Sequence, residues 1–385
     1  MSRMKRALIV PVALAALLAG GAMHIVQDQC GPFTDVTPAF CPFILELYYL
    51  GITVGTSSTT FSPDDPLTRG QGAVFVAKGL NQALARSSRR AALGQWWTTT
   101  PHWDLGLGVT DVGPFPTFCA SDGADVWVAN EDFGGPGSVS RVRASDGRLL
   151  ETWTGATGGI AVLSAMGRIF VAGASSSMLF EIDPSQPAGA VTPVAALGNV
   201  PQGLAFDGAR IWSVNNLGSV SIVTPGTWSV TNVPGFSAPL GIVYDGANIW
   251  ITDATANTLL KLDANGAVLQ TVPVGSEPLT PVFDGANIWV PNLNDNTVSV
   301  VSAASGVVLA TLSGNGLVGP TAPGFDGRRV LITNEFADTV SLWNAADLTP
   351  LGSVSTGTGS RPLGVCGDGV NFWIPLSAAN RLARF

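Results

Sequence analysis

The fold is decided by residues 278–312, which read PLTPVFDGANIWVPNLNDNTVSVVSAASGVVLATL. Four short apolar runs are separated by turn-forming residues: Asp-Gly-Ala-Asn after the first, a polar Asn-Asp loop after the second and Ser-Gly after the third. The expected strands are Pro278–Phe283, Ile288–Val290, Thr297–Ser302 and Val307–Leu312. Their nearly continuous apolar character is typical of a sheet that is covered on both faces.

The same pattern recurs along most of the chain. Its marker is Asp-Gly followed by an apolar and aromatic run, which begins at Asp122, Asp207, Asp245, Asp284, Asp326 and Asp368, with a degenerate copy at Met166-Gly167. The period is about forty residues, and with four short strands per unit it is the signature of a propeller blade. The sequence therefore predicts an all-β fold, a seven-bladed β-propeller over residues 102–385.

A large ring follows the turn in nearly every unit. The position is filled by Trp127, Phe170, Trp212, Trp250, Trp289 and Trp373, with Leu331 as the exception. Such a series could form a sugar-binding ladder on a surface. One ring per blade within a strand instead predicts the packing core between blades.

The ends of the propeller are expected to close on each other. The chain stops at Phe385 after a third strand, so His102–Leu107, just upstream of the first blade, is the expected donor of the missing fourth strand. Cys119 and Cys366 lie on the inner strands of the first and last blades, at positions whose side chains face opposite ways along a strand. A disulfide across the junction is expected, with two buried free thiols as the alternative.

The N-terminus has the features of a targeting signal. Arg3, Lys5 and Arg6 precede the short apolar stretch Ala7–Ala19, and the small residues Gly20-Gly21-Ala22 follow it. This predicts a signal peptide over residues 1–22, because the apolar stretch is short for a bilayer span. An N-terminal membrane anchor is the alternative. With the signal removed, we expect a secreted or envelope protein with no transmembrane span.

Residues 30–82 have a different pattern. They contain Phe-x-Asp-Val at 33–36, a helical apolar spacing over 39–50, Gly-Ile-x-x-Gly at 51–55, and Phe-x-Pro-x-x-Pro-Leu-Thr-Arg at 61–69 before a second helix. This order resembles the S-layer homology (SLH) domain. The resemblance implies a small helical module that binds wall or envelope polysaccharide, with Asp35, Thr68 and Arg69 as ligand contacts. The planar donors of an Arg suit acidic or pyruvylated sugars.

Two departures from the family pattern stand out. Gln71 occupies a position where the family usually has Glu, and one module is present where family members tend to carry three. A helical cap that packs on the propeller is the alternative. Cys30 and Cys41 are expected to pair, because so small a domain has little core. Residues 83–101 are expected to form a linker.

Charge excludes one class of partner. Charged residues are only 12% of the chain, and the net charge is −8. From Trp103 onward we count 11 Lys/Arg against 22 Asp/Glu, and Lys261 is the single lysine. Phosphate backbones are bound by clustered Lys and Arg, so nucleic acid is not an expected partner.

The blade repeats resemble YVTN/NHL-type propeller repeats, including those of surface-layer propellers and of virginiamycin B lyase. Such a resemblance gives a fold and not an activity. The lyase chemistry implies two histidines and a glutamate in the propeller, whereas the histidines here are His24 and His102, outside the blade loops. No nucleophile elbow, His/Cys metal spacing or phosphate loop occurs, so no catalytic residue is predicted.

Polar residues are expected to gather on one face of the ring, in the loops after second strands and between blades. They are Glu131, Asp132, Asn215, Asp253, Glu277, Asn292, Asp295, Asn334, Glu335 and Asp338. Their oxygens suit Ca²⁺, a cationic partner or a sugar, whereas the same residues commonly cap their own turns. The expected function is a non-enzymatic, envelope-tethered interaction protein. The alternatives are an enzyme with a metal or carboxylate site on this face, and a structural surface-layer component that self-associates.

Overall fold

The computed structural model describes residues 32–37, 40, 44, 47–48, 53–76, 109–132, 135–144, 147–369 and 371–385. The chain divides into two compact units, Met1–Thr100 and Pro101–Phe385. The predicted signal peptide, the linker, and both Cys30 and Cys41 lie outside the described residues.

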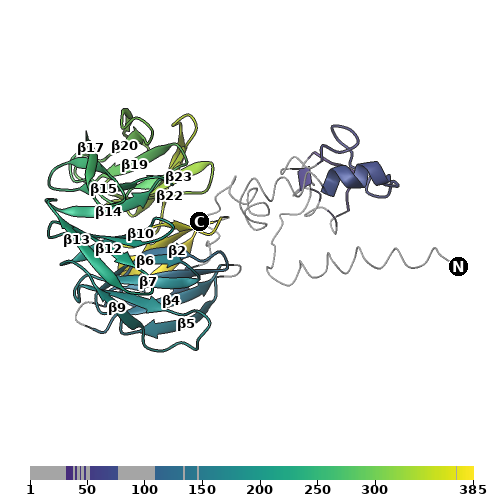
Figure 1. Cartoon of the computed structure of the whole chain (residues 1–385). Helices are drawn as coiled ribbons and strands as arrows, with labels where there is room; N and C mark the ends of the chain where they lie inside the picture. The colour runs from purple at the N-terminus through teal and green to yellow at the C-terminus, as the bar shows by residue number, and fades with distance from the viewer. Residues whose placement is uncertain are drawn as a thin grey trace. The chain divides into compact units, whose positions relative to one another are not determined.

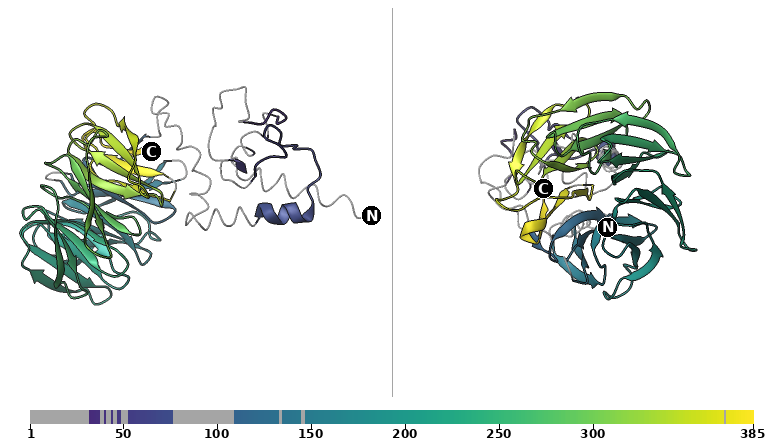
Figure 2. Two further views of the ribbon diagram at one scale, coloured as in Figure 1. Left: turned by 90° about the horizontal axis from the view of Figure 1, so that it is seen from above. Right: turned by 90° about the vertical axis from the view of Figure 1, so that its left-hand side faces the viewer.

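The second unit is a ring of seven four-stranded antiparallel sheets (Figures 1 and 2), which confirms the predicted seven-bladed propeller. Six blades use four consecutive strands, in spatial order from the inside of the ring outward. The seventh is assembled from both ends of the unit, as β26-β27-β28-β1.

The first four blades occupy residues 116–273. Blade one comprises β2 (Pro116–Ser121), β3 (Asp125–Asn130), β4 (Ser138–Arg143) and β5 (Leu149–Thr154). Blade two comprises β6 (Gly159–Ala165), β7 (Arg168–Gly173), β8 (Met178–Ile182) and β9 (Thr192–Ala196). Blade three comprises β10 (Pro201–Phe206), β11 (Ile211–Asn215), β12 (Ser219–Thr224) and β13 (Ser229–Pro234). Blade four comprises β14 (Pro239–Tyr244), β15 (Ile249–Asp253), β16 (Thr258–Leu262) and β17 (Val268–Pro273).

The remaining strands complete the ring. Blade five comprises β18 (Val282–Phe283), β19 (Asn287–Asn292), β20 (Thr297–Ser302) and β21 (Val308–Leu312). Blade six comprises β22 (Pro320–Phe325), β23 (Arg329–Asn334), β24 (Thr339–Asn344) and β25 (Pro350–Ser355). Blade seven comprises β26 (Cys366–Gly367), β27 (Phe372–Leu376), β28 (Arg381–Arg384) and β1 (Val109–Asp111).

The second strand of each blade forms the core. Every residue of β3, β11, β15 and β27 is buried, as expected for strands with a blade on either side. The rings that follow the turns are completely buried: Trp127, Phe170, Trp212, Trp250, Trp289 and Trp373. They are therefore packing residues, and a surface ladder for sugars is excluded for these six.

One inner strand is shorter than the sequence predicts. β18 begins at Val282 rather than at Pro278, and only an isolated bridge joins Pro278 to Asn292. Backbone contact with β19 persists before β18, since the N–H of Leu279 donates to the carbonyl oxygen of Pro291 at 2.9 Å.

The ring closes through the N-terminal end of the unit, as predicted, but with a different segment. β1 pairs with β28, placing Val109 opposite Ala383 and Asp111 opposite Arg381, whose side chains form an ion pair of 3.0 Å. The predicted donor, His102–Leu107, lies outside the described residues. The prediction was wrong about the segment because register is set by the partner strand and not by a local apolar pattern.

A disulfide reinforces the same junction. Cys119 on β2 and Cys366 on β26 are bonded, with their Cα atoms 5.5 Å apart and a sequence separation of 247. The pair lies in a hydrophobic cluster with Trp373 and Val128. The predicted bridge is thus confirmed, and the two free thiols are excluded.

The described part of the first unit is built around Phe33. Its ring makes edge contacts with Tyr48 at 5.3 Å and with Phe61 at 5.7 Å between centroids. Gly55 has φ +81°, and a Cβ there would lie 2.5 Å from the Phe33 ring, so the second glycine of Gly-Ile-x-x-Gly is required by packing. A helix covers residues 69–76, as expected. In the described ranges, no helix has the length and apolar character needed to cross a membrane.

Candidate binding sites

Asp35, a predicted sugar contact, serves the architecture of the first unit. Its Oδ1 accepts the backbone N–H of Phe61 at 2.9 Å, and its Oδ2 accepts that of Ser62 at 2.7 Å. The hydrogen bonds from Phe61 and Ser62, that of Phe61 foremost, hold the pKa of Asp35 below its usual value. Asp35 therefore ties the Phe-x-Asp-Val motif to the Phe-Ser-Pro turn.

Thr68 begins the second helix. Its Oγ1 accepts the N–H of Gln71 at 3.2 Å, while Gln71 Oε1 accepts the N–H of Thr68 at 2.9 Å and its hydroxyl at 2.8 Å. This reciprocal arrangement is a capping box, in which Gln serves as well as Glu. The departure at Gln71 thus leaves the fold of the module intact, and the Thr68 hydroxyl is engaged by the cap.

Arg69 stands apart from its two neighbours in the motif. It is the first residue of the helix, it is exposed, and it forms no ion pair with any described residue. A cation at a helix N-terminus gains nothing from the helix dipole, whose positive end lies there. An exposed guanidinium beside the N-terminus of a helix is an arrangement that generally favours anions.

The Asp-Gly turns of the propeller do more than reverse the chain. In five blades the aspartate Oδ2 accepts the indole N–H of the tryptophan five residues later, at 2.7–2.8 Å: Asp122–Trp127, Asp207–Trp212, Asp245–Trp250, Asp284–Trp289 and Asp368–Trp373. The other carboxylate oxygen caps backbone N–H groups of the turn. Sequence reasoning missed this bond, although the regular Asp-Gly-x-x-x-Trp spacing carries the signal.

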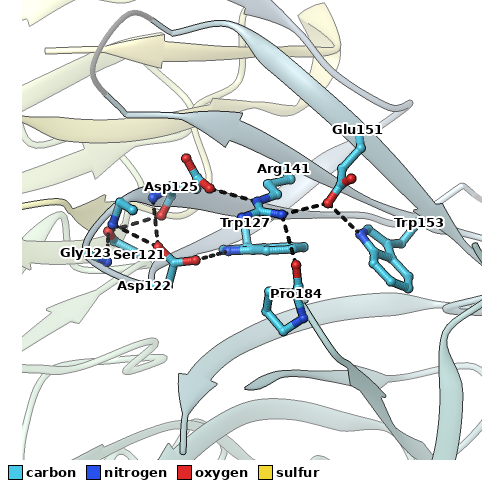
Figure 3. A network of polar contacts seen from close by, with 10 residues as sticks. Ser121, Asp122, Gly123, Asp125, Trp127, Arg141, Glu151, Trp153 and Pro184 are labelled. Atoms are coloured by element: carbon cyan, nitrogen blue, oxygen red, sulfur yellow. Dashed lines mark hydrogen bonds and ion pairs between the residues drawn. The ribbon is translucent and has the colours of Figure 1, made fainter. Parts of the chain in front are cut away.

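Blade one extends this contact into a polar network (Figure 3). The guanidinium of Arg141 lies 5.0 Å from the centroid of the Trp127 ring and pairs with Asp125 at 2.7 Å and Glu151 at 2.9 Å. It also donates to the carbonyl oxygen of Pro184, in blade two, at 3.3 Å. These groups satisfy one another between two blades, so the network is structural.

Three carboxylates on the predicted acidic face are turn caps. Asp253 is 2% exposed and accepts the N–H groups of Ser237 at 2.7 Å and Ala238 at 3.0 Å. Asp295 accepts the N–H of Ser276 at 2.6 Å. Asp338 accepts those of Gly359 and Arg361, at 2.6 and 2.8 Å. Each joins a second-strand loop to the neighbouring loop between blades.

The asparagines expected on this face are not on the surface. Asn215, Asn292 and Asn334 are fully buried, and each side-chain amide donates to hydroxyl groups on the third strand of its own blade. Asn130 does the same through Ser138 and Ser140. Their prediction as ligand-facing groups was wrong, because an Asn at a strand end serves equally well as an internal clasp.

The remaining acidic groups lie in separate blades. Glu335 pairs with Arg361 at 2.6 Å, and Glu277 accepts the side-chain amide of Asn294 at 2.7 Å. Burial raises the pKa of Glu131, beside Asp132. Sequence reasoning missed Arg361, whose guanidinium also lies over the Phe115 ring at 5.5 Å. A basic residue directly before the first proline of blade seven, where blade five has Glu277, was the available signal.

These groups do not converge. Within the part of the chain that the structure describes, no three His, Cys, Asp or Glu side chains are placed to hold a metal ion. Glu131 has the raised pKa that suits a general acid, and no described titratable partner is assembled around it. The arrangement can present single charges and hydrogen-bonding groups to a partner.

Comparisons with known proteins agree with both units. The family model for the S-layer homology domain matches residues 32–73. An endoglucanase from Bacillus sp. (strain KSM-635) is 47% identical over 56 residues. That match covers 14% of this chain and 6% of the endoglucanase, so the chain spans only a small part of that relative.

The propeller resembles solved structures in fold alone. A streptogramin B lyase structure aligns with a TM-score of 0.59 and 16% identity, over 72% of this chain and 96% of the lyase. Inactive virginiamycin B lyase from Staphylococcus aureus with quinupristin gives 0.60 and 15%, over 72% and 98%. Hydrazine synthase of Kuenenia stuttgartiensis gives 0.61 and 17%, over 72% and 96%.

The motifs, the packing around Phe33 and the family match agree on the first unit. An S-layer homology domain binds cell-wall polysaccharide, which indicates a location at the cell surface or envelope. Residues 32–73 are an S-layer homology domain, and the chain joins that domain to a seven-bladed β-propeller related in fold to virginiamycin B lyase.

Proposed function

We propose that this protein is a wall-tethered binding protein, in which Arg69 holds the polysaccharide and the propeller presents its acidic loops to a further partner. The observation that carries the tether is the exposed guanidinium of Arg69 at the start of a capped helix. Asp35 and Thr68, whose polar atoms are engaged within the domain, shape the site rather than contact the sugar.

The ligand at Arg69 is an acidic group on the polysaccharide, such as a pyruvyl ketal or a uronate. A guanidinium binds a carboxylate through two parallel N–H donors, and the helix N-terminus adds partial positive charge. A neutral wall polymer would draw no benefit from either feature.

The test is co-sedimentation of the full mature protein with purified cell-wall sacculi. We expect Arg69→Ala to lower the apparent affinity at least tenfold, and Arg69→Lys to restore only part of it because an ammonium lacks the planar pair of donors. Arg328→Ala, which removes an exposed arginine from the propeller, is the control for charge and should bind as the wild type does.

Two outcomes would contradict the proposal. Equal sedimentation of wild type and Arg69→Ala would show that the guanidinium is not the contact. No sedimentation of the wild type would show that a single SLH domain does not tether this chain. Asp35→Ala should also reduce binding, but with a loss of helical circular dichroism that Arg69→Ala does not share.

For the propeller, the proposal rests on charge. The surplus of acidic over basic residues lies in the blades, and Glu131, Glu277 and Glu335 are on loops at the same end of the strands. A cationic or hydroxyl-rich partner suits this face better than an anionic one. The buried asparagines and the three capping aspartates are not part of the proposed surface.

A further inference from the structure

We infer that the outermost strand of blade five, β21, is a contact through which two copies of this chain pair edge to edge. β21 lies at the end of its sheet, and in the described structure no strand pairs with it on its outer side. Every second N–H and C=O of such a strand points outward and offers hydrogen bonds to another strand.

β21 differs from the other six outermost strands of the ring. Each of those carries a proline or an acidic residue, which are groups that discourage strand addition: Asp111 in β1, Glu151 in β5, Pro193 in β9, Pro234 in β13, Pro273 in β17 and Pro350 in β25. β21 reads VLATL and has neither. The pairing of β20 with β21 contains a β-bulge. This bulge does not set β21 apart, because blades one, two, four and six have a bulge at the corresponding place.

The side chains of β21 are apolar and exposed. Val307, just before the strand, and Leu309 within it are each 55% exposed, and Val308 is 38% exposed. Exposed apolar side chains next to open backbone groups fit an extended apolar strand.

The occupant to which we commit is a second copy of β21. An antiparallel pair centred on Ala310 places the small side chain at the two-fold axis and Leu309 opposite Thr311 of the partner subunit. Such a contact uses the same surface on both chains and closes as a dimer rather than a fibre. β21 also carries no charged side chain, so pairing through it keeps the repulsion between two acidic propellers small.

The surface area that the two β21 strands bury indicates that the pair is weak. Two five-residue strands with their flanking side chains bury a few hundred Å² per copy, below the roughly 800 Å² per partner of a stable complex. We therefore expect a weak, transient pair that forms in solution only at high protein concentration. Attachment to a common surface raises the effective concentration and favours the pair there.

The experiment is sedimentation velocity of the full mature protein from about 1 µM to 1 mM. Leu309→Lys should raise the dissociation constant at least tenfold. Leu269→Lys is the matched control: Leu269 is 57% exposed at the corresponding place on β17, whose edge carries Pro273, and its effect should stay under threefold. Ala310→Cys should give a covalent dimer on mild oxidation, which tests the register independently of affinity.

Three results would overturn the inference. They are a chain that stays monomeric at 1 mM, an association that Leu309→Lys leaves unchanged, and an equal loss with Leu269→Lys. Association through the SLH domain would appear as the second of these. Sedimentation on sacculi is measured separately with Arg69→Ala, so failure of the tether and failure of the strand contact are distinguishable.

Discussion

Replacing both Cys119 and Cys366 by alanine should lower the free energy of unfolding of the propeller by about 5 kcal/mol and its melting temperature by roughly 10 °C. The bridge joins residues 247 apart, so it restricts the unfolded chain over almost the whole propeller. The measurement is thermal and urea unfolding of the full chain, followed by tryptophan fluorescence.

The size of this effect depends on how the ring is closed. Without the bridge, the first and last blades are held by the three residue pairs of β1 and β28 and by the packing of Trp373. The double variant should still fold, because that pairing remains. Substitution isolates this bridge, whereas a reductant acts on all four cysteines of the chain. Equal unfolding midpoints for wild type and double variant would show that β1 alone closes the ring.

Much of the propeller could be predicted from the sequence because its repeat is local. A turn at Asp284-Gly285, a ring five residues after the aspartate and two further apolar runs specify one blade without knowledge of its neighbours. The Cys119–Cys366 bridge could also be predicted, since its residues lie on the inner strands of the first and last blades, at positions whose side chains face opposite ways.

The predictions that were wrong concern contacts between segments that lie far apart in the sequence. The closing strand was placed at His102–Leu107, whereas Val109–Asp111 fits β28 through a backbone register and an Asp111–Arg381 pair that no local pattern encodes. Asn292 and Asn334 could equally have faced a ligand or a strand. Which of the two occurs depends on where the third strand places its serine hydroxyl groups, and the sequence alone does not show that position.

The SLH domain shows the same division. Its motif order predicted the helix start at Thr68 and the importance of Asp35. The sequence could not show that both are engaged by the backbone while Arg69 is left exposed. This distinction is what supports Arg69, rather than Asp35 or Thr68, as the proposed sugar contact.

Asp284→Ala should destabilise the propeller by about 2–4 kcal/mol, because it leaves a buried indole N–H without an acceptor. Asp284 Oδ2 accepts the N–H of Trp289, which is fully buried, at 2.7 Å, and its Oδ1 accepts two backbone N–H groups of the turn. In the variant, the backbone N–H groups of the turn can form hydrogen bonds with water, whereas the buried indole N–H cannot. Urea unfolding of the full chain measures the loss.

Blade six provides the matched control. Asp326 caps the N–H groups of Arg328 and Arg329 in the same way, but Leu331 fills the ring position, so Asp326 Oδ2 pairs with the Arg329 guanidinium at 2.8 Å and not with an indole. Measured in an Arg329→Ala chain, which removes that ion pair beforehand, Asp326→Ala should therefore cost about 1–2 kcal/mol less than Asp284→Ala. In a Trp289→Phe background the Asp284→Ala loss should shrink by a similar amount. If both aspartates cost the same and the background has no effect, the carboxylate acts only as a turn cap, and the regular Asp-to-Trp spacing reflects turn geometry alone.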